Sequence, residues 1–295
     1  MSKPKIGFIG LGLMGGAMVS RLQDQGYDVT VLGNRDRTEL DKAIARGAHE
    51  GLSARDVAEK SDIIMLCVGT SDQVEGRMRG PDGVIAGLSA GKTVIDFGTS
   101  LPASTRELGA EVAATGAAMM DAPIGRTPQQ ALIGKLNLMC AGERATFDAV
   151  QPVLQDLAEN LFYLGDLGAG HTVKLINNFF AQTVATAMAE AFVMADVAGV
   201  EREAVYDVMS KGPGHSPMMD FIRSYAVDGD SSVMAFAIKN ASKDLGYYRR
   251  MAEDAGVPSV MSASTAEALA AATQTDLAEE NVPVMVEHFA RLMKG

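Results

Sequence analysis

A lysine and two asparagines stand close together at the start of a long apolar segment: Lys174, Asn177 and Asn178. Residues 171–198 contain neither glycine nor proline, so this segment predicts one long helix. Residues three and four apart share a helix face, which brings one ammonium and two carboxamides together. An ammonium within reach of a substrate oxygen can deliver the proton that reduction of a carbonyl requires. The alternative is a lysine that extends from a core helix to water, with its asparagines near the helix end.

A glycine-rich turn near the N-terminus predicts dinucleotide binding. The strand-like run KIGFIG leads into Gly10, Gly12 and Gly15 at G-x-G-x-x-G spacing, with Leu13 and Met14 between the last two, and a helix-forming stretch follows. Gly10 permits the tight turn, Gly12 lets the backbone approach the pyrophosphate, and Gly15 allows close packing of helix and strand. The alternative is an ordinary turn, but the position between strand and helix favours the cofactor site.

The end of the second predicted strand, YDVTVL, bears on the choice between NAD and NADP. An acidic residue there would accept a hydrogen bond from the ribose 2′-hydroxyl, whereas an arginine favours the 2′-phosphate. Gly33, Asn34 and Arg35 stand at this point, followed by Asp36 and Arg37. We therefore assign Asn34 and Arg35 to the cofactor site and favour NADP(H), while Asp36 leaves NAD(H) open. The alternative for the arginines is a solvated loop.

Strand and helix patterns alternate through the rest of the first half, which predicts a doubly wound parallel sheet. The runs DIIMLCV and TVIDF have the continuous apolar character of buried parallel strands, and Ser53 is placed to cap the helix ARDVAEK. Ligands bind at the carboxyl ends of such strands, where Val68 and Thr99 lie, so both are assigned to the nicotinamide. An ordinary turn threonine is the alternative for Thr99.

The loop of residues 123–129 joins two strand-like runs and contains Gly125, Arg126 and Thr127. A guanidinium is suited to bidentate binding of a carboxylate, phosphate or sulfonate. Arg126 is therefore a candidate for binding an anion, and a surface arginine is the alternative.

Strand patterns end after Leu164, and helical periodicity marks residues 201–211, 235–255, 262–273 and 282–293. The change in composition predicts two domains, residues 1–166 and 167–295. His171 is a candidate for shaping the site and His215 for chemistry, although a loop histidine is more often structural. No spacing of histidine, cysteine and carboxylate residues indicates a metal site.

Bulk properties indicate a soluble cytoplasmic protein. With 295 residues the chain is long enough for two domains, and its formal net charge of −11 argues against a nucleic-acid partner. Cys67 and Cys140 lie in apolar runs and are expected to be buried, reduced thiols. The first residues lead straight into a strand pattern, which leaves no room for a signal peptide, and no apolar run reaches the length of a membrane span.

Four motifs occur in the same order as in the β-hydroxyacid dehydrogenases, the 3-hydroxyisobutyrate dehydrogenase-like family. GFIGLGLMGGAM resembles the cofactor fingerprint, DFGTSLP the D-x-S-T-x-x-P loop, GAGHTVKLINN the catalytic G-x-G-x-x-x-K-x-x-N-N, and KDLGYY the late K-D-L segment. The resemblance covers nearly the whole chain. It implies an α/β Rossmann N-terminal domain and an all-α C-terminal domain joined by a long helix, in a homodimer or homotetramer.

The resemblance also implies residue roles. Lys174 is the expected general acid/base at the substrate oxygen, and Asn177 and Asn178 hold the substrate. Thr99 contacts cofactor or substrate, and Lys243 lies close to the cofactor.

Two positions depart from the family pattern. The usual loop D-x-P-V-S-G-G is replaced here by a sequence ending in Gly125, Arg126 and Thr127, which removes a serine hydroxyl and adds a cation. This G-R-T loop resembles the sulfolactaldehyde reductase branch, whose loop faces a sulfonate. Gly98 stands where the family has serine, so a hydroxyl on the cofactor side is missing.

The predicted activity is an NAD(P)-dependent interconversion of a small aldehyde and its alcohol, on a substrate with an anionic tail. Candidate substrates are sulfolactaldehyde and the semialdehydes of methylmalonate, tartronate and succinate. The alternatives are a 3-hydroxyisobutyrate dehydrogenase proper, an imine reductase-like enzyme, which generally lacks the lysine, and a non-catalytic dinucleotide-sensing protein.

Overall fold

The computed structural model describes residues 3–33 and 36–294, so the predicted cofactor residues Asn34 and Arg35 lie outside the described residues. The chain divides into two compact units, Met1–Lys174 and Leu175–Gly295, called here the first and second unit. The predicted long helix is confirmed as α8 (Ala169–Val197), and the division between the units falls within it.

A parallel sheet with the strand order β3-β2-β1-β4-β5-β6 forms the centre of the first unit. This order is that of dinucleotide-binding folds, so the predicted Rossmann architecture is confirmed. The strands are β1 (Ile6–Ile9), β2 (Val29–Leu32), β3 (His49–Glu50), β4 (Ile63–Leu66), β5 (Thr93–Asp96) and β6 (Ala118–Asp121).

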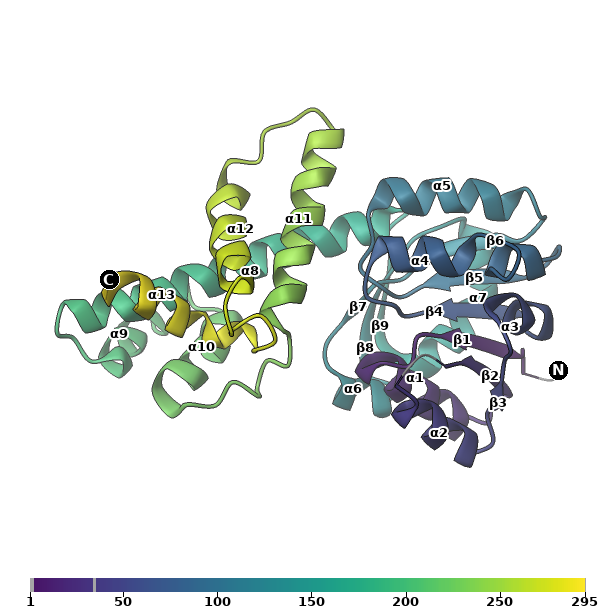
Figure 1. Cartoon of the computed structure of the whole chain (residues 1–295), viewed down its shortest axis with the longest axis horizontal. Coiled ribbons are helices and arrows are strands. Elements are labelled where there is room, and N and C mark those ends of the chain that lie inside the picture. Colours follow the sequence, from purple (N-terminus) through teal and green to yellow (C-terminus); the bar gives the residue numbers. More distant parts are fainter. Residues whose placement is uncertain (1–2, 34–35, 295) are drawn as a thin grey trace. The chain divides into compact units, whose positions relative to one another are not determined.

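Helices cover both faces of this sheet, whose strands follow one another from β3 at the bottom to β6 at the top in Figure 1. One face is covered by α1 (Leu13–Asp24), α2 (Thr38–Ala45) and α7 (Arg144–Leu157), and the other by α3 (Ala54–Lys60), α4 (Ser71–Met78), η1 (Val84–Gly87) and α5 (Pro102–Ala113). Successive strand residues point to opposite faces, so Met65 packs into one core and Leu66 into the other.

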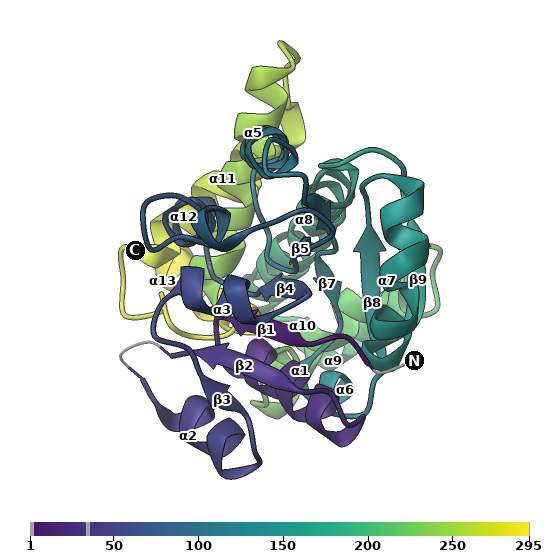
Figure 2. The same ribbon diagram turned by 90° about the vertical axis from the view of Figure 1, so that its right-hand side faces the viewer.

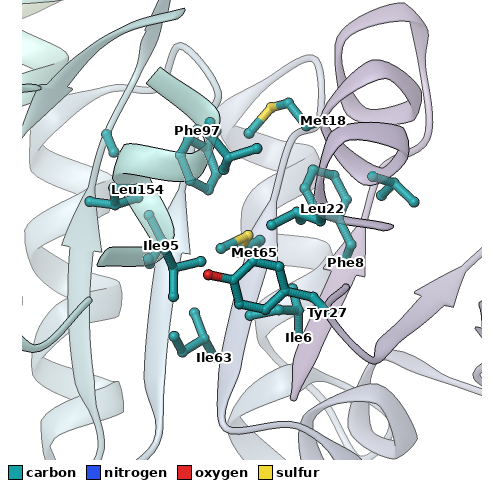
Figure 3. Close-up of a cluster of buried hydrophobic side chains, with 14 of the residues drawn as sticks. Ile6, Phe8, Met18, Leu22, Tyr27, Ile63, Met65, Ile95, Phe97 and Leu154 are labelled. Carbon is teal, nitrogen blue, oxygen red and sulfur yellow. The ribbon is translucent and has the colours of Figure 1, made fainter. Parts of the chain in front are cut away.

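Figure 3 draws the core between the sheet and α1, where Phe8 from β1 and Leu22 from α1 lie on one side of Met65 and Ile95 from β5 lies on the other. Each fully buried apolar side chain of this size contributes about 1.5–3 kcal/mol relative to exposure. Both faces of the sheet are thereby fixed, which holds the carboxyl ends of the strands in place.

A second, three-stranded sheet follows in the first unit, built from β7 (Ile124–Gly125), β8 (Leu136–Cys140) and β9 (Ala158–Tyr163). The short helix α6 (Pro128–Leu132) lies between β7 and β8 in the chain, and α7 packs beside β8 and β9 (Figure 2). Part of the loop predicted at residues 123–129 is therefore the short strand β7, which pairs antiparallel with β8.

The second unit is helical, as predicted: among its described residues no strand occurs, only an isolated bridge between Ala237 and Asn281. Besides α8, its elements are α9 (Arg202–Met209), α10 (Pro217–Asp228), α11 (Ile238–Asp254), α12 (Val260–Thr273), η2 (Val282–Val284) and α13 (Met285–Lys294). Helix α10 was not predicted, although the sequence carries its boundary signals. Ser216 caps it, Pro217 opens it, and Gly229 ends it in a left-handed conformation.

Two local predictions have different outcomes. Ser53 does cap α3, because its hydroxyl accepts the Asp56 amide. The prediction that both cysteines are buried is wrong for Cys67, which is only half-buried because it lies just beyond the end of β4, whereas Cys140 is buried. Loss of solvent around the sulfur still raises the pKa of each thiol to about 12, so neither is a ready nucleophile.

Candidate active site

In the glycine-rich turn between β1 and α1, only Gly12 has open space beside it, whereas Gly10 and Gly15 pack closely against the backbone. Gly10 has a φ of +102°, and a Cβ there would lie 2.3 Å from the Cys67 carbonyl oxygen. A Cβ on Gly15 would lie 1.8 Å from the Gly10 carbonyl oxygen, so the helix packs directly on the turn. A Cβ on Gly12 would meet no atom within 4 Å, and Gly12 is the N-cap of α1 without any side-chain cap.

These features fit a dinucleotide. Amide groups at the open N-terminus of α1 would attract a pyrophosphate, and Gly12 leaves the space that its close approach would require. Gly10, Gly12 and Gly15 therefore stand where the sequence placed them, with Leu13 and Met14 in the first turn of α1.

The loop after β5 is held by a buried aspartate that sequence reasoning did not single out. Asp96 accepts the Gly98 amide at 2.8 Å through Oδ1 and the Ser100 hydroxyl at 2.9 Å through Oδ2. Both Asp96 and Ser100 are buried, so this loop has a fixed path around Thr99. Thr99 and Val68 follow the carboxyl ends of β5 and β4, as predicted.

Lys174 lies in the second turn of α8 and is half-buried. Its Nζ donates to the Ile124 carbonyl oxygen at 2.7 Å. Ile124 opens β7 and directly precedes Gly125, so the first unit brings the lysine and the start of the predicted substrate loop together. A lysine that extends freely into water would show no such contact.

The glycines of the GAGHTVK motif have physical reasons to be there. Gly168 has a φ of +90°, a conformation that suits glycine, and it begins the chain into α8. A Cβ on Gly170 would lie 2.2 Å from the Met139 carbonyl oxygen and 2.7 Å from Oδ2 of Asp121. Glycine is therefore needed for α8 to start against β8 and Asp121.

Arg126 has an unusual backbone, with a φ of +80°, the only positive φ among the described residues other than glycine. Glycine would adopt this conformation without strain, whereas a residue with a Cβ rarely does. Arg126 uses Nη1 to donate to the Lys135 carbonyl oxygen at 2.8 Å and to Oε2 of Glu159 at 2.5 Å. Thr127 caps α6 in a capping box with Gln130.

In the second unit, Asn178 is buried and donates to Oδ2 of Asp244 at 2.6 Å. Asp244 is itself buried, and its Oδ1 lies 3.1 Å from Nζ of Lys243. Asn177 is exposed and donates to the Asn178 side-chain oxygen at 3.3 Å. Asp244 was missed in the sequence, although the K-D-L segment contains it.

The two candidate histidines differ. His171 is completely buried, and its Nδ1 lies 2.8 Å from the Thr105 hydroxyl. His215 is exposed, with Nε2 at 2.7 Å from Oδ1 of Asp220, in the turn before α10. Within the described ranges, no group of three or more His, Cys, Asp and Glu side chains has the arrangement of a metal site.

Comparison with known proteins agrees with this geometry. Residues 5–165 match the NAD binding domain of 6-phosphogluconate dehydrogenase, and residues 168–289 match the family described as NAD-binding of NADP-dependent 3-hydroxyisobutyrate dehydrogenase. The 2-(hydroxymethyl)glutarate dehydrogenase of Eubacterium barkeri is 30% identical over 286 residues, covering 96% of this chain and 94% of the relative. The chain belongs to the 3-hydroxyisobutyrate dehydrogenase-like family of β-hydroxyacid dehydrogenases.

Solved structures with the same fold agree with this. The 3-hydroxyisobutyrate dehydrogenase of Salmonella typhimurium is 27% identical, with a TM-score of 0.83, covering 97% of this chain and 99% of that one. Psf3 in complex with NADP+ and 2-OPP is 25% identical, also with a TM-score of 0.83 and the same coverage. The chain is therefore an NAD(P)-binding member of a family of hydroxyacid dehydrogenases.

Within this dehydrogenase fold, a cavity of about 430 Å³ lies beside the end of β2. Its lining includes Gly33, Ser53, Arg77 and Arg79. Arg79 is paired with Glu75 and Glu111, whereas Arg77 makes no ion pair within the described part of the chain. Sequence reasoning missed Arg77, which lines the same cavity as Gly33 but lies far from it along the chain.

Among the described residues, no helix combines the length and the apolar character needed to cross a bilayer.

Proposed function

We propose that this protein is an NADP(H)-preferring reductase that interconverts a small aldehyde and its alcohol, on a substrate with an anionic tail. The observation that carries this proposal is the hydrogen bond from Lys174 Nζ to the Ile124 carbonyl oxygen, at 2.7 Å. The ammonium thereby lies beside Ile124, in the loop of residues 123–129 that continues into Gly125 and Arg126. A proton donor and an anion-binding cation are the two groups that this reaction requires from the protein.

The nicotinamide supplies or accepts the hydride, and the protein contributes position and a proton. The open N-terminus of α1 at Gly12 would hold the pyrophosphate, and the residues after β4 and β5, Val68 and Thr99, would face the nicotinamide. Lys174 delivers its proton to the alkoxide oxygen as charge develops there, and takes it back in the oxidative direction. The Ile124 carbonyl orients the ammonium through one of its three N–H groups.

Arg126 and Thr127 are the proposed contacts of the anionic tail, with Asn177 and Asn178 of α8 as further substrate contacts and Lys243 as a cofactor contact. Nη1 is the only nitrogen of Arg126 with a hydrogen bond among the described residues. The Nη2 and Nε groups of the guanidinium can therefore donate to an anion. The guanidinium suits two kinds of anionic tail. One is a sulfonate, as in sulfolactaldehyde, and the other is a carboxylate, as in the semialdehydes of methylmalonate, tartronate and succinate. The name of the Eubacterium barkeri relative supports a carboxylate.

The preference for NADP(H) is supported by Arg77 at the cavity beside the end of β2. Assembly into a homodimer or homotetramer is supported by exposed apolar side chains of α8 in the second unit, including Ile176, Phe180 and Val197. We place the enzyme in the cytoplasm, as its composition predicts.

The decisive experiment follows oxidation of NADPH and NADH with a panel of sulfolactaldehyde and the three semialdehydes. Wild type, Lys174→Ala and Arg126→Ala are compared for turnover and for NADPH affinity. Lys174→Ala should bind NADPH normally and lose turnover by at least about 100-fold, the scale of general acid catalysis. Tight cofactor binding without turnover of any aldehyde would instead indicate a sensor, and full activity of Lys174→Ala would refute the assigned chemistry.

A further inference from the structure

Asp121, the last residue of β6, is fully buried and fixed at both its backbone and its side chain. Its backbone forms a bridge with Ala141, through hydrogen bonds of 3.0 Å and 2.8 Å. Its carboxylate accepts the Gly168 amide at 2.7 Å through Oδ1 and the His171 amide at 2.7 Å through Oδ2. One carboxylate therefore ties the start of α8 to the end of the main sheet.

The segment that begins at Asp121, residues 121–124, also binds Lys174. Ile124 lies three residues after Asp121, and its carbonyl oxygen accepts Lys174 Nζ at 2.7 Å. His171 and Lys174 are three residues apart on α8, so they lie on the same side of the helix. Residues 121–124 thus contact two consecutive turns of α8. The Asp121 carboxylate accepts the His171 amide, and the Ile124 carbonyl accepts the Lys174 ammonium.

We propose that Asp121 is the positioning residue for Lys174, because its carboxylate fixes the turn of α8 from which the lysine projects. This inference rests on the proposed role of Lys174 as the acid/base. Asp121 acts only through the helix and contacts no reacting atom.

Opposing influences act on the carboxyl group of Asp121. Burial raises its pKa, while the His171 ring and the two amides at the start of α8 favour the charged form. The His171 ring lies 3.7 Å from carboxylate oxygens of both Asp121 and Asp96. Since Asp96 orders the loop around Thr99, one histidine connects the cofactor-side loop with the start of α8.

A buried aspartate also explains the glycine at position 170. A Cβ there would lie 2.7 Å from Oδ2 of Asp121 and 3.2 Å from Pro123 Cδ. Any larger residue would move α8 away from the segment that holds Lys174. The glycine, the aspartate and the lysine are therefore parts of one arrangement.

The test is a double-mutant cycle of Asp121→Asn and Lys174→Ala in the full-length enzyme. The matched control is Asp62→Asn, because Asp62 also accepts a backbone amide, that of Lys5 at 2.8 Å, but on the exposed surface. For each variant we measure kcat and KM for the best aldehyde of the panel and Kd for NADPH. Asp121→Asn should lower kcat by roughly 100-fold, the cost of a misplacement of about 1 Å, with KM and Kd changed less than about threefold.

The cycle separates positioning from a general loss of structure. In the Lys174→Ala background, Asp121→Asn should lower kcat no further, because its effect passes through the lysine. Additive losses in the double variant, or a loss shared equally by kcat, KM and NADPH binding, would overturn the proposal. Asp62→Asn should match wild type.

Gly170→Ala provides a second route if Asp121→Asn folds poorly, since it displaces the same turn and leaves every charge in place. It should also lower kcat without a further loss in the Lys174→Ala background. If Lys174→Ala itself keeps full activity, the proposed function fails. If Lys174→Ala is inactive while Asp121→Asn and Gly170→Ala are fully active, only the positioning role fails.

Discussion

Arg126 and Glu159 form an ion pair in which Nη1 of the guanidinium donates to a carboxylate oxygen at 2.5 Å. This hydrogen bond lowers the pKa of Glu159, so the carboxylate is charged at neutral pH. Glu159 therefore already binds Nη1 of Arg126, the side chain that we assign to the anionic tail of the substrate. The backbone of Arg126 is at the same time in a left-handed conformation that costs about 1–2 kcal/mol for a residue with a Cβ.

Replacement of Arg126 by glycine should separate these two effects. Arg126→Gly relieves the left-handed backbone and removes an exposed ion pair of small value, so the free energy of unfolding should stay within about 1 kcal/mol of wild type. KM for the anionic aldehyde should rise at least about tenfold, since the charge-assisted hydrogen bonds to the tail are lost. Urea denaturation and steady-state kinetics measure the two quantities, and an unchanged KM would reduce Arg126 to a surface residue.

Glu159→Gln tests whether Glu159 competes with the substrate anion for the Arg126 guanidinium. A neutral amide holds the guanidinium less strongly than a carboxylate does, so Arg126 becomes more available to an anion. KM for the anionic aldehyde should fall by about two- to fivefold, which corresponds to about 0.5–1 kcal/mol for an exposed ion pair. A higher KM would mean that Glu159 orients Arg126 for the substrate.

The glycine-rich turn permits a matched comparison of Gly12→Ala and Gly15→Ala. A Cβ at position 12 enters open space, so that variant should fold normally and bind NADPH at least about tenfold more weakly. A Cβ at position 15 would overlap the Gly10 carbonyl, so that variant should lose about 1–3 kcal/mol of stability. Cofactor titration and thermal unfolding would show the two effects, and normal NADPH binding by Gly12→Ala would place the pyrophosphate elsewhere.

Arg77 should contribute to the choice of cofactor. It lines the cavity beside the end of β2, where a 2′-phosphate would add negative charge. Arg77→Ala should raise KM for NADPH at least about fivefold more than KM for NADH, because the lost contact is to a charged group. Arg79→Ala is the control, since Arg79 is paired with Glu75 and Glu111. Equal effects on the two cofactors would remove Arg77 from the NADP site.

The stability of the second unit should depend on pH through His288 on α13. Burial lowers the pKa of this histidine, and Arg291 lowers it further. The unfolded chain then binds more protons below a pH of about 6.5, so the stability present above that value is lost as the pH falls.

His288→Leu removes this titration and should make the free energy of unfolding less dependent on pH between about 5 and 7. Comparison with wild type at pH 8, where the imidazole is neutral, gives the packing difference alone. Urea denaturation at several pH values provides the measurement, and parallel curves for the two proteins would contradict the prediction.

Much of the fold was predictable because its signals are local. The absence of glycine and proline predicted α8, the spacing of Gly10, Gly12 and Gly15 predicted the first turn, and Ser53 was recognised as a cap. Helix α10 was missed because its first residues belong to a Gly- and Pro-rich stretch that reads as a loop. The strand β3 was also missed, since two residues carry no period.

The sequence by itself determined the family and the Rossmann order of strands and helices, because motifs and periodic patterns are local. It also singled out Lys174 as the proton donor to test, because spacing along one helix decides which side chains share a face. Only the tertiary structure revealed what holds that lysine. The Asp121 carboxylate meets the Gly168 amide across 47 residues of sequence, and Arg126 meets Glu159 across 33. Contacts of this kind depend on how separate elements pack, and no local pattern in the chain records them.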